Sequence, residues 1–336
     1  MLNEQNEEKL CLVTGGSGFL GLHVISTLVK EGYKVRTTVR DINNETKMLP
    51  IKKIQQSTKH PIEIVYADLL NPKSWQSAIK DVKIVMHTAS PFPNDMPKDD
   101  QELIKPALEG TLNIFNAAFE AGCVEKIVLT SSVVTVSGQS REDRMFNEDD
   151  WPELDKLSSY GKSKYLAEKA AWDFVEAKKR EKLKCFNLAV INPTFIIGPS
   201  LHLDLSAIGT SERRILEVLT GKAKQIRSWY VAVCDVRDVA LAHLNAAVRD
   251  EANGKRHIVA TNKRFNSMKE FADILREEFE PRGFNITKDE EPGPGNNTRV
   301  DNTRLIQVLG IEPIALKDTL VDMANSLIEA GIAGKY

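Results

Sequence analysis

Cysteine is scarce in this chain of 336 residues, which contains four cysteines and no Cys-x-x-Cys pair. Cys11, Cys123, Cys185 and Cys234 lie far apart, so they do not form the closely spaced framework of a small disulfide-rich secreted module. The six histidines likewise show no paired spacing that is typical of metal ligands. We therefore expect four reduced thiols and no bound metal.

Long apolar runs and an excess of one charge are also missing. No run approaches the roughly 18 consecutive apolar residues that a membrane-spanning helix needs. Lysine and arginine number 45 against 47 aspartates and glutamates, a formal net charge of -2, so nucleic acid or an acidic membrane is not an expected partner. The first ten residues are polar and acidic, unlike a signal peptide, and we expect a cytoplasmic protein.

The composition that is present, 42% hydrophobic and 27% charged, is ordinary for a globular protein and supplies a core of useful size. Short apolar runs of strand length alternate with longer segments of helical periodicity. We expect strands at residues 10–14, 33–40, 62–66, 83–87, 126–130, 186–191 and 257–260, and helices at 20–30, 102–121, 160–179, 236–248, 267–279, 303–309 and 316–330. This β–α alternation predicts an α/β fold with a doubly wound (Rossmann) parallel sheet, covered by helices on both faces.

The alternation breaks after Pro199, and the break indicates a second, smaller domain. The C-terminal part of the chain shows mainly helical patterns around a loop rich in proline, glycine and asparagine. We expect a nucleotide-binding Rossmann domain and a mostly helical substrate-binding domain. The first consists of residues 1–198 and about 230–262, and the second of residues about 199–229 and 263–336.

A glycine-rich turn, Gly15-Gly16-Ser17-Gly18-Phe19-Leu20-Gly21, lies between the first expected strand and the first expected helix. It satisfies both G-x-x-G-x-x-G and G-x-G-x-x-G. Glycine permits positive φ, lets the backbone approach a pyrophosphate, and lets strand and helix pack closely. The N-terminus of the helix then offers free N–H groups to phosphate oxygens. The turn therefore predicts a dinucleotide-binding site.

The end of the second expected strand bears on which dinucleotide is bound. An acidic residue there binds the ribose 2′-hydroxyl of NAD, whereas an arginine accommodates the 2′-phosphate of NADP. The strand ends in Val39-Arg40-Asp41, and spacing from the glycine turn does not separate Arg40 from Asp41. Lys47 could add a second positive charge. We favour NADPH, with NAD left open by the spacing.

Two polar groups suggest carbonyl chemistry. Tyr160 and Lys164 lie four residues apart on an expected helix, so they share one face about 6 Å apart. An adjacent ammonium is expected to lower the pKa of a phenol and to make it a usable proton donor. Thr130-Ser131-Ser132 closes the fifth expected strand, at the edge where a doubly wound sheet binds its ligands. A serine hydroxyl there can bind a substrate oxygen as it gains charge.

With these features in this order, the chain resembles the extended short-chain dehydrogenases/reductases. The resemblance points to the branch of dihydroflavonol reductases, cinnamoyl-CoA reductases and yeast-type methylglyoxal and ketone reductases. It covers almost the whole chain. It rests on VTGGSGFLG (13–21), TVRD (38–41), ADL (67–69), HTASPF (87–92), VLTSS (128–132), YGKSK (160–164), AEKAAW (167–172), NPTFIIGP (192–199) and DVRDVALAH (235–243).

The resemblance implies that Ser132, Tyr160 and Lys164 are the catalytic residues and that NADP(H) is the cofactor. Tyr160 and Lys164 are also expected to touch the cofactor. The further expected cofactor contacts are Gly15, Ser17, Gly18, Phe19, Leu20 and Gly21 in the turn, Arg40 and Lys47 at the 2′-phosphate, Asp68 and Leu69 at the adenine, Thr88, Ala89, Ser90, Pro193, Thr194, Phe195 and Ile196 near the nicotinamide and its ribose, and Ser211. The substrate pocket is expected to include Ser90, Phe92, Thr194 and Phe195, whose two aromatic rings suit an apolar or aromatic carbonyl compound.

The sequence departs from the wider family in three places. Where many short-chain dehydrogenases have a helix asparagine, this chain has Ala107. Leu157-Ser158-Ser159 precedes Tyr160 in place of the K-N-W-Y signature of cinnamoyl-CoA reductases, so a CoA thioester is not the expected substrate. Val133 and Val134 follow Ser132 where sugar-nucleotide dehydratases have an acidic pair, which argues against dehydration.

The sequence therefore predicts an NADPH-dependent reductase of a small, apolar or aromatic aldehyde or ketone. Two alternatives remain: an epimerase that acts on nucleotide sugars and retains NAD, and a non-catalytic protein that binds NADPH. We expect a monomer or homodimer whose partner is a small-molecule carbonyl substrate.

Overall fold

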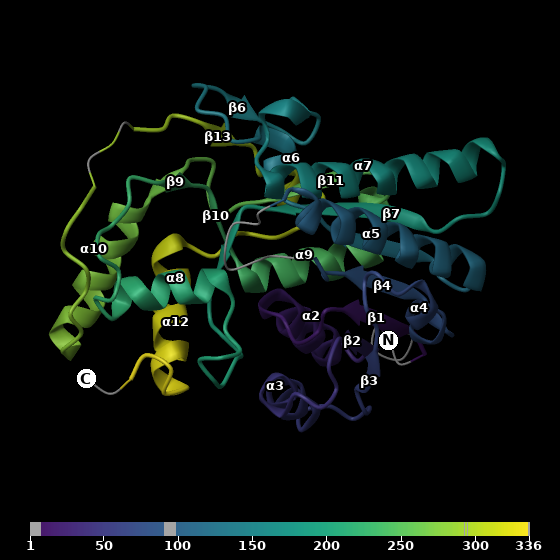
Figure 1. Cartoon of the computed structure of the whole chain (residues 1–336), viewed down its shortest axis with the longest axis horizontal. Helices are drawn as coiled ribbons and strands as arrows, with labels where there is room; N and C mark the ends of the chain where they lie inside the picture. The colour runs from purple at the N-terminus through teal and green to yellow at the C-terminus, as the bar shows by residue number, and fades with distance from the viewer. Residues whose placement is uncertain (1–7, 91–98, 292, 294, 335–336) are drawn as a thin grey trace.

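The chain folds around a sheet of seven strands. The computed structural model, drawn in Figure 1, describes residues 8–90, 99–291, 293 and 295–334. All neighbouring strands of this sheet are parallel, in the order β11-β7-β5-β4-β1-β2-β3. The strands are β1 (Leu10–Thr14), β2 (Lys34–Val39), β3 (Glu63–Tyr66), β4 (Ile84–His87), β5 (Lys126–Thr130), β7 (Asn187–Pro193) and β11 (Arg256–Val259). The predicted doubly wound α/β fold is confirmed.

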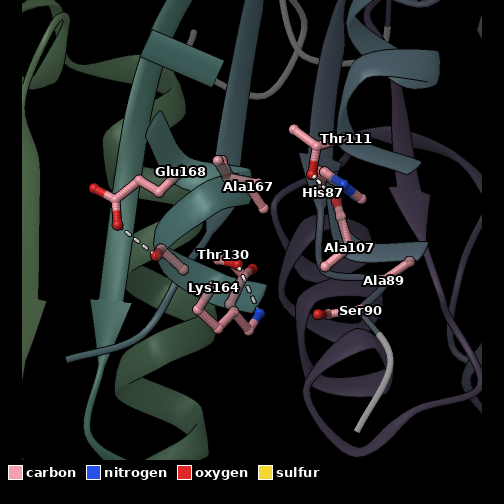
Figure 2. A pocket seen from close by; sticks show the side chains of 11 residues that line it. His87, Ala89, Ser90, Ala107, Thr111, Thr130, Lys164, Ala167 and Glu168 are labelled. Carbon is pink, nitrogen blue, oxygen red and sulfur yellow. Dashed lines mark hydrogen bonds between the residues drawn. The ribbon is translucent and has the colours of Figure 1, made fainter. Parts of the chain in front are cut away.

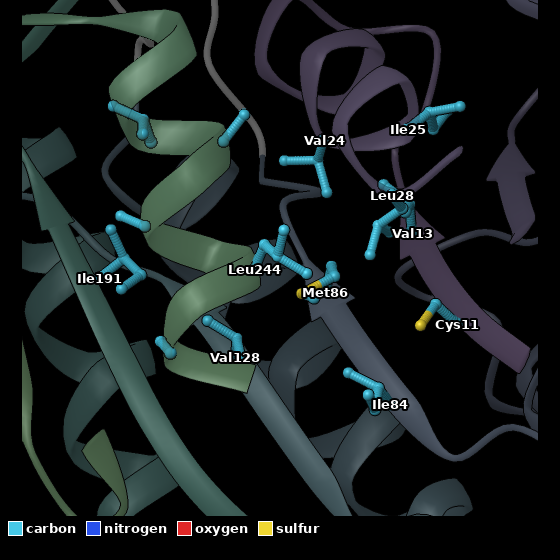
Figure 3. Packing of buried hydrophobic residues seen from close by; sticks show 14 of the residues in the cluster. Cys11, Val13, Val24, Ile25, Leu28, Ile84, Met86, Val128, Ile191 and Leu244 are labelled. Carbon is cyan, nitrogen blue, oxygen red and sulfur yellow. The ribbon is translucent and has the colours of Figure 1, made fainter. Parts of the chain in front are cut away.

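Helices cover both faces of the sheet because side chains alternate between the faces along each strand. Cys11 and Val13 point into one core, which is shown in Figure 3, and Leu12 points into the other. The first core includes residues of α2 (Phe19–Lys30), α3 (Glu45–Gln55) and α9 (Val236–Val248). The second includes residues of α4 (Pro72–Ile79), α5 (Gln101–Ala121) and α7 (Ser159–Arg180).

A separate helical unit has its own apolar core, formed by side chains such as Ile215, Phe271, Leu320 and Met323. Its helices are α8 (Thr210–Leu219), α10 (Met268–Phe279) and α12 (Leu316–Glu329), which lie together at one end of the sheet in Figure 1. Two short strand pairs accompany it: β8 (Phe195–Ile197) with β10 (Val233–Asp235), and β9 (Tyr230–Val231) with β12 (Asn266–Ser267).

One stretch of the C-terminal region packs against the sheet and not against this helical unit. Strand β13 (Arg299–Val300) pairs with β6 (Met145–Phe146), and α11 (Thr303–Gln307) follows it directly. Leu305 and Leu309 are buried in the same core as α2 and α9. We therefore propose that residues 299–311 belong with the Rossmann domain, in contrast to the division expected from the sequence.

Several short helices complete the fold and were not expected from the sequence: α3, α4, α6 (Val134–Ser137) and α8, with the 3-10 turns η1 (Leu154–Lys156), η2 (Asp250–Ala252) and η3 (Glu280–Arg282). Among the described residues no helix is long and apolar enough to span a membrane. Cys11 and Cys234 are buried free thiols, and Cys123 and Cys185 are half-buried free thiols.

The sheet order reverses between β1 and β4, and such a switch point is where doubly wound sheets bind their ligands. Side chains at the carboxyl ends of these two strands are joined, because Thr14 Oγ1 lies 2.8 Å from Nδ1 of His87. The same hydroxyl accepts a hydrogen bond from the N–H of Ala89 at 3.0 Å. The expected cofactor segments around residues 15–21 and 88–90 therefore meet at this edge.

Candidate active site

The glycine turn leaves no room for side chains at several positions. A Cβ added to Gly16 would lie 1.8 Å from Thr37 Oγ1, and one added to Gly21 would lie 2.4 Å from the carbonyl oxygen of Gly15. Gly15 itself has a φ of +70° and packs against Ala89. Only glycine therefore fits at Gly16 and Gly21, so strand and helix pack closely around the turn, as they do at a dinucleotide phosphate site.

Helix α2 starts directly behind this turn, with Gly18 as the residue that precedes its first turn. In the part of the chain that the structure describes, the N–H groups of Phe19 and Leu20 donate to no protein acceptor. Free N–H groups and the positive end of the helix dipole together favour an anion at this place.

Arg40 and Asp41, which spacing alone did not separate, have different surroundings. The carboxylate of Asp41 accepts a hydrogen bond from the N–H of Asn43 at 2.9 Å, within a tight turn. Arg40 is exposed at the end of β2, and its guanidinium has no hydrogen-bond or ion-pair partner among the described residues. Lys47 lies in the first turn of α3, which follows β2. Arg40 therefore has an unpaired guanidinium at the end of β2 in the described structure, and Lys47 lies in the next helix along the chain.

The residues expected at the adenine and nicotinamide lie at or just beyond the carboxyl ends of three parallel strands, β3, β4 and β7. Asp68 and Leu69 follow β3, and both backbone carbonyls accept side-chain hydrogen bonds, from Trp75 at 2.9 Å and Asn113 at 2.7 Å. Ser90, after β4, is half-buried. The other members of this set are Thr88 and Ala89 after β4 and Pro193, Thr194, Phe195 and Ile196 at the end of β7 and in β8.

Ser132 and Tyr160 are brought together although they are 28 residues apart in the chain. Ser132 is the second residue after β5, and Tyr160 lies in the first turn of α7. Their side chains are hydrogen-bonded to each other. The neighbouring Ser131 points elsewhere and donates to Glu168 instead. Of the two serines that follow β5, Ser132 is therefore the one placed beside the phenol.

Lys164 lies one helical turn beyond Tyr160 on α7 and is buried. Figure 2 shows its ammonium group directed at the end of β5, where Nζ donates to the carbonyl oxygen of Thr130 at 3.3 Å. Ala107 lines the same small cavity on the opposite side, so an asparagine amide is absent there. Burial lowers the pKa of Lys164 to about 8, and the negative charge of Glu168 opposes this shift.

Burial raises the pKa of the Tyr160 phenol above its usual value, and the hydrogen bond with Ser132 lowers it only in part. The pKa of Tyr160, which we expected to be lowered, is therefore raised, because desolvation of the phenolate outweighs the effects that favour it. A raised pKa keeps the phenol protonated at neutral pH. The protonated form is the one that can donate a proton to a substrate oxygen.

Glu168 is a buried carboxylate that the sequence analysis did not single out. It continues the spacing of four residues from Tyr160 and Lys164 along α7. Its oxygens accept hydrogen bonds from Ser131 Oγ, Thr135 Oγ1 at 2.6 Å, Asn192 Nδ2 at 3.0 Å, Trp172 Nε1 at 3.3 Å and Arg256 Nε at 2.6 Å.

This network supports the backbone of the expected catalytic serine. Thr135 Oγ1 also lies 2.8 Å from the carbonyl oxygen of Ser132, and Arg256 donates to the carbonyl oxygen of Thr135 at 2.7 Å. Glu168 therefore sits behind the site as the counter-charge of Arg256 and as a charged neighbour of Lys164.

His202 and Glu212 form a second buried pair, next to the glycine turn. Nδ1 of His202 lies 2.9 Å from a carboxylate oxygen of Glu212, and Nε2 lies 3.2 Å from the carbonyl oxygen of Ser17. Burial alone would lower the pKa of His202, but the hydrogen bond and charge of Glu212 raise it above its usual value. The ring thus joins α8 to the expected phosphate turn.

Two further residues were predicted to lie at the cofactor or in the substrate pocket. Ser211 is half-buried in the first turn of α8. Phe92 lies outside the residues that the structure describes. No group of three or more histidine, cysteine, aspartate or glutamate side chains in the described segments is arranged to hold a metal ion.

The fold and this Ser–Tyr–Lys arrangement define a short-chain dehydrogenase/reductase of the extended type, as the sequence predicted. Residues 12–282 match the 3-beta hydroxysteroid dehydrogenase/isomerase family, and the chain belongs to that family.

Among curated relatives, the chain is 32% identical to the NADPH-dependent methylglyoxal reductase of Saccharomyces cerevisiae, over 94% of this chain and 97% of the relative. It is also 32% identical to tetraketide alpha-pyrone reductase 1 of Arabidopsis thaliana, over 98% of each chain. A solved structure of the yeast methylglyoxal/isovaleraldehyde reductase complexed with NADPH superposes with a TM-score of 0.82 and 32% identity, covering 96% of this chain and 99% of that one.

Proposed function

We propose that this protein is an NADPH-dependent reductase that transfers a hydride to the carbonyl carbon of a small apolar or aromatic aldehyde or ketone. The observation that carries the proposal is the hydrogen bond between Ser132 and Tyr160, with Lys164 one turn further on, at the ligand-binding edge of the sheet. Reductases of methylglyoxal and of a tetraketide pyrone among the relatives support the same reaction class.

The residues present fit a dinucleotide phosphate. The glycine turn excludes side chains, the N–H groups of Phe19 and Leu20 are free within the described structure, and Arg40 is an unpaired cation at the end of β2. Arg40 and Lys47 would hold the 2′-phosphate, and the helix N-terminus would hold the pyrophosphate. When bound, the reduced nicotinamide supplies the hydride.

The protein's own groups would perform the remaining chemistry. Ser132 donates a hydrogen bond to the substrate oxygen, which orients the carbonyl and stabilises the negative charge that develops on it. Tyr160, protonated at neutral pH, gives its proton to the same oxygen. Lys164 places a positive charge beside the site, which stabilises the phenolate left on Tyr160. Glu168 and Arg256 fix the backbone around Ser132.

The test is oxidation of NADPH by the purified protein with a panel of carbonyl compounds: methylglyoxal, phenylacetaldehyde, a diketone, a β-keto ester and a dihydroflavonol. We expect turnover with at least one apolar or aromatic member and a clear preference for NADPH over NADH. Tightly retained NAD with no net consumption of NADPH would indicate a nucleotide-sugar epimerase instead. Binding of NADPH without turnover on the whole panel would indicate a non-catalytic binding protein.

A further inference from the structure

Arg214, on helix α8, lies in a cluster of aromatic and positively charged side chains. Its guanidinium carbon is 4.4 Å from the ring centre of Trp229 and 5.8 Å from that of Phe195. The two rings contact each other edge to face, with centres 5.3 Å apart. Arg227 lies close enough to influence the charge of Arg214. We call these four residues the Arg214 cluster.

No carboxylate forms an ion pair with Arg214 within the described ranges. By contrast, Arg237, Arg256 and Arg276 are each paired with aspartate or glutamate at 2.6–2.7 Å. Glu217, one turn along α8, favours the charge of Arg214 only from a distance. A half-buried guanidinium without a counter-ion differs from the usual pattern, in which desolvated charges are paired.

The surroundings of Arg214 disfavour its positive charge. Burial lowers the pKa of the guanidinium, and the like charge of Arg227 lowers it further. An anion bound beside the guanidinium of Arg214 would compensate both effects. Arginine is suited to such a ligand, because its planar fork can donate two parallel hydrogen bonds to a carboxylate or a phosphate.

The Arg214 cluster lies within reach of the proposed reaction site. The N–H of Val133, next to Ser132, donates to the carbonyl oxygen of Pro193 at 2.9 Å. Phe195 is two residues further along the chain, at most about 7 Å beyond Pro193 because an extended residue spans no more than about 3.6 Å. Phe195 therefore connects the Ser132 region with Arg214, over a distance that an elongated small molecule can span.

We propose that Arg214 binds a negatively charged oxygen group, carboxylate or phosphate, at the end of the carbonyl substrate remote from the reacting carbon. The rings of Phe195 and Trp229 would contact the apolar or aromatic part of the substrate, between its carbonyl group and its anionic group. Arg227 adds a second positive charge at the anion. This inference rests on the proposed reductase function and adds an anionic group to one end of the apolar or aromatic carbonyl compound proposed there.

The experiment compares 4-formylcinnamate with its methyl ester, which has the same reacting aldehyde but no charge, and adds 4-formylphenyl phosphate as the phosphate arm. The values of kcat/KM with NADPH are measured for the wild type, Arg214→Leu and Arg213→Leu. Arg213 is the matched control, because it is the adjacent arginine on α8 and binds only the carbonyl oxygen of Leu205, at 3.5 Å, within the described structure.

In Arg214→Leu, the ratio of kcat/KM for the acid to that for the ester should fall by about 10- to 100-fold, as expected for the loss of a charged hydrogen bond. Arg213→Leu should leave this ratio within about threefold. The comparison with 4-formylphenyl phosphate shows which anion is preferred. The anionic substrate that has a higher kcat/KM than the ester in the wild type should no longer have it in Arg214→Leu.

An unchanged ratio in Arg214→Leu, with the wild type still reducing the ester, would overturn the Arg214 assignment and leave the reductase function intact. If the wild type reduced none of the three aldehydes, nor any member of the broader panel, both proposals would fall. If Arg214→Leu does not fold, the comparison uses Arg214→Gln instead, together with the dependence of the wild-type KM on salt concentration. Salt should raise KM for the preferred anion and not for the ester, and equal effects on both would overturn the inference.

Discussion

At the level of single side chains, the neighbours Arg40 and Asp41 differ in their hydrogen bonding. Asp41 is engaged in a backbone turn, whereas Arg40 is free within the described structure. Spacing alone left the two equivalent, because both lie at the expected distance from the glycine turn, and the resemblance favoured Arg40. The local hydrogen bond to Asn43 is what separates them.

Replacing Arg40 should therefore change the cofactor preference. We expect Arg40→Leu to raise KM for NADPH by about tenfold or more, because a charged contact with the 2′-phosphate is lost, while KM for NADH stays within about twofold. The measurement is steady-state kinetics with both cofactors. Lys53→Leu, at an exposed position on the same α3 helix, is the control. An equal rise of KM for both cofactors would contradict the assignment.

The part of the site that could be predicted from sequence is the part encoded in short, local patterns. The glycine turn and the Tyr160–Lys164 spacing each lie within one segment, and the serine of the expected set is joined to Tyr160 as the resemblance implied. Arg256 could not be found in this way, since its partner Glu168 is 88 residues away and shares no motif with it. The same holds for Arg214, whose aromatic neighbours come from other elements.

At the level of elements, helix α7 carries both the proposed catalytic side chains and a buried carboxylate that supports them. Tyr160, Lys164 and Glu168 repeat at intervals of four residues, so they follow one another along the helix. Glu168 is the innermost of the three and is paired with Arg256 of β11 at 2.6 Å, with both side chains buried. Removing one member of a buried ion pair leaves an uncompensated charge in a poorly solvated place.

Arg256→Met should accordingly lower the free energy of unfolding by about 3–5 kcal/mol. Arg264→Met, which removes an exposed pair with Glu270, should cost no more than about 1 kcal/mol. Urea titration followed by circular dichroism measures both. Adding Glu168→Gln to Arg256→Met should recover part of the loss, because the unpaired charge is then gone. Equal losses in Arg256→Met and Arg264→Met would show that the buried pair is not a structural support.

The elements that could be predicted are those whose pattern is long or strongly apolar. Strands β1 and β5 and helix α9 have the expected bounds, since their apolar residues repeat clearly. Helix α8 was missed because it has only ten residues, too few to be stable without tertiary contacts. Its apolar side chains, including Ile215 and Leu219, are buried against those of α10 and α12, and this packing is not visible in a local window of sequence.

At the level of the whole molecule, the segment that follows β8 joins the two cores. The N–H of Ser200 donates to Ser326 Oγ of α12 at 2.7 Å, while Nε2 of His23, on α2, lies 2.8 Å from the carbonyl oxygen of Pro199. His202 then connects Glu212 of α8 with Ser17 of the glycine turn. The helical unit is thereby tied directly to the expected pyrophosphate site.

The His202 contact should depend on pH. Because the pKa of His202 is raised in the folded protein, its contribution to stability is fully present below about pH 6.5, the usual unfolded value, and is lost as the pH rises through the raised value. We expect the difference in free energy of unfolding between the wild type and His202→Gln to narrow as the pH rises from 6 to 9. Urea titrations at several pH values measure it, with His60→Gln as the control. A difference that stays constant or widens over this range would contradict the assignment.

The most direct test of the account is hydride transfer by Tyr160→Phe, measured in a single turnover at saturating NADPH. We predict that Tyr160→Phe transfers the hydride about 100-fold or more slowly than the wild type. NADPH binding should be retained, because only the proton-donating hydroxyl is removed. A rate close to that of the wild type would contradict the role of Tyr160 and the carbonyl-reductase mechanism built on it.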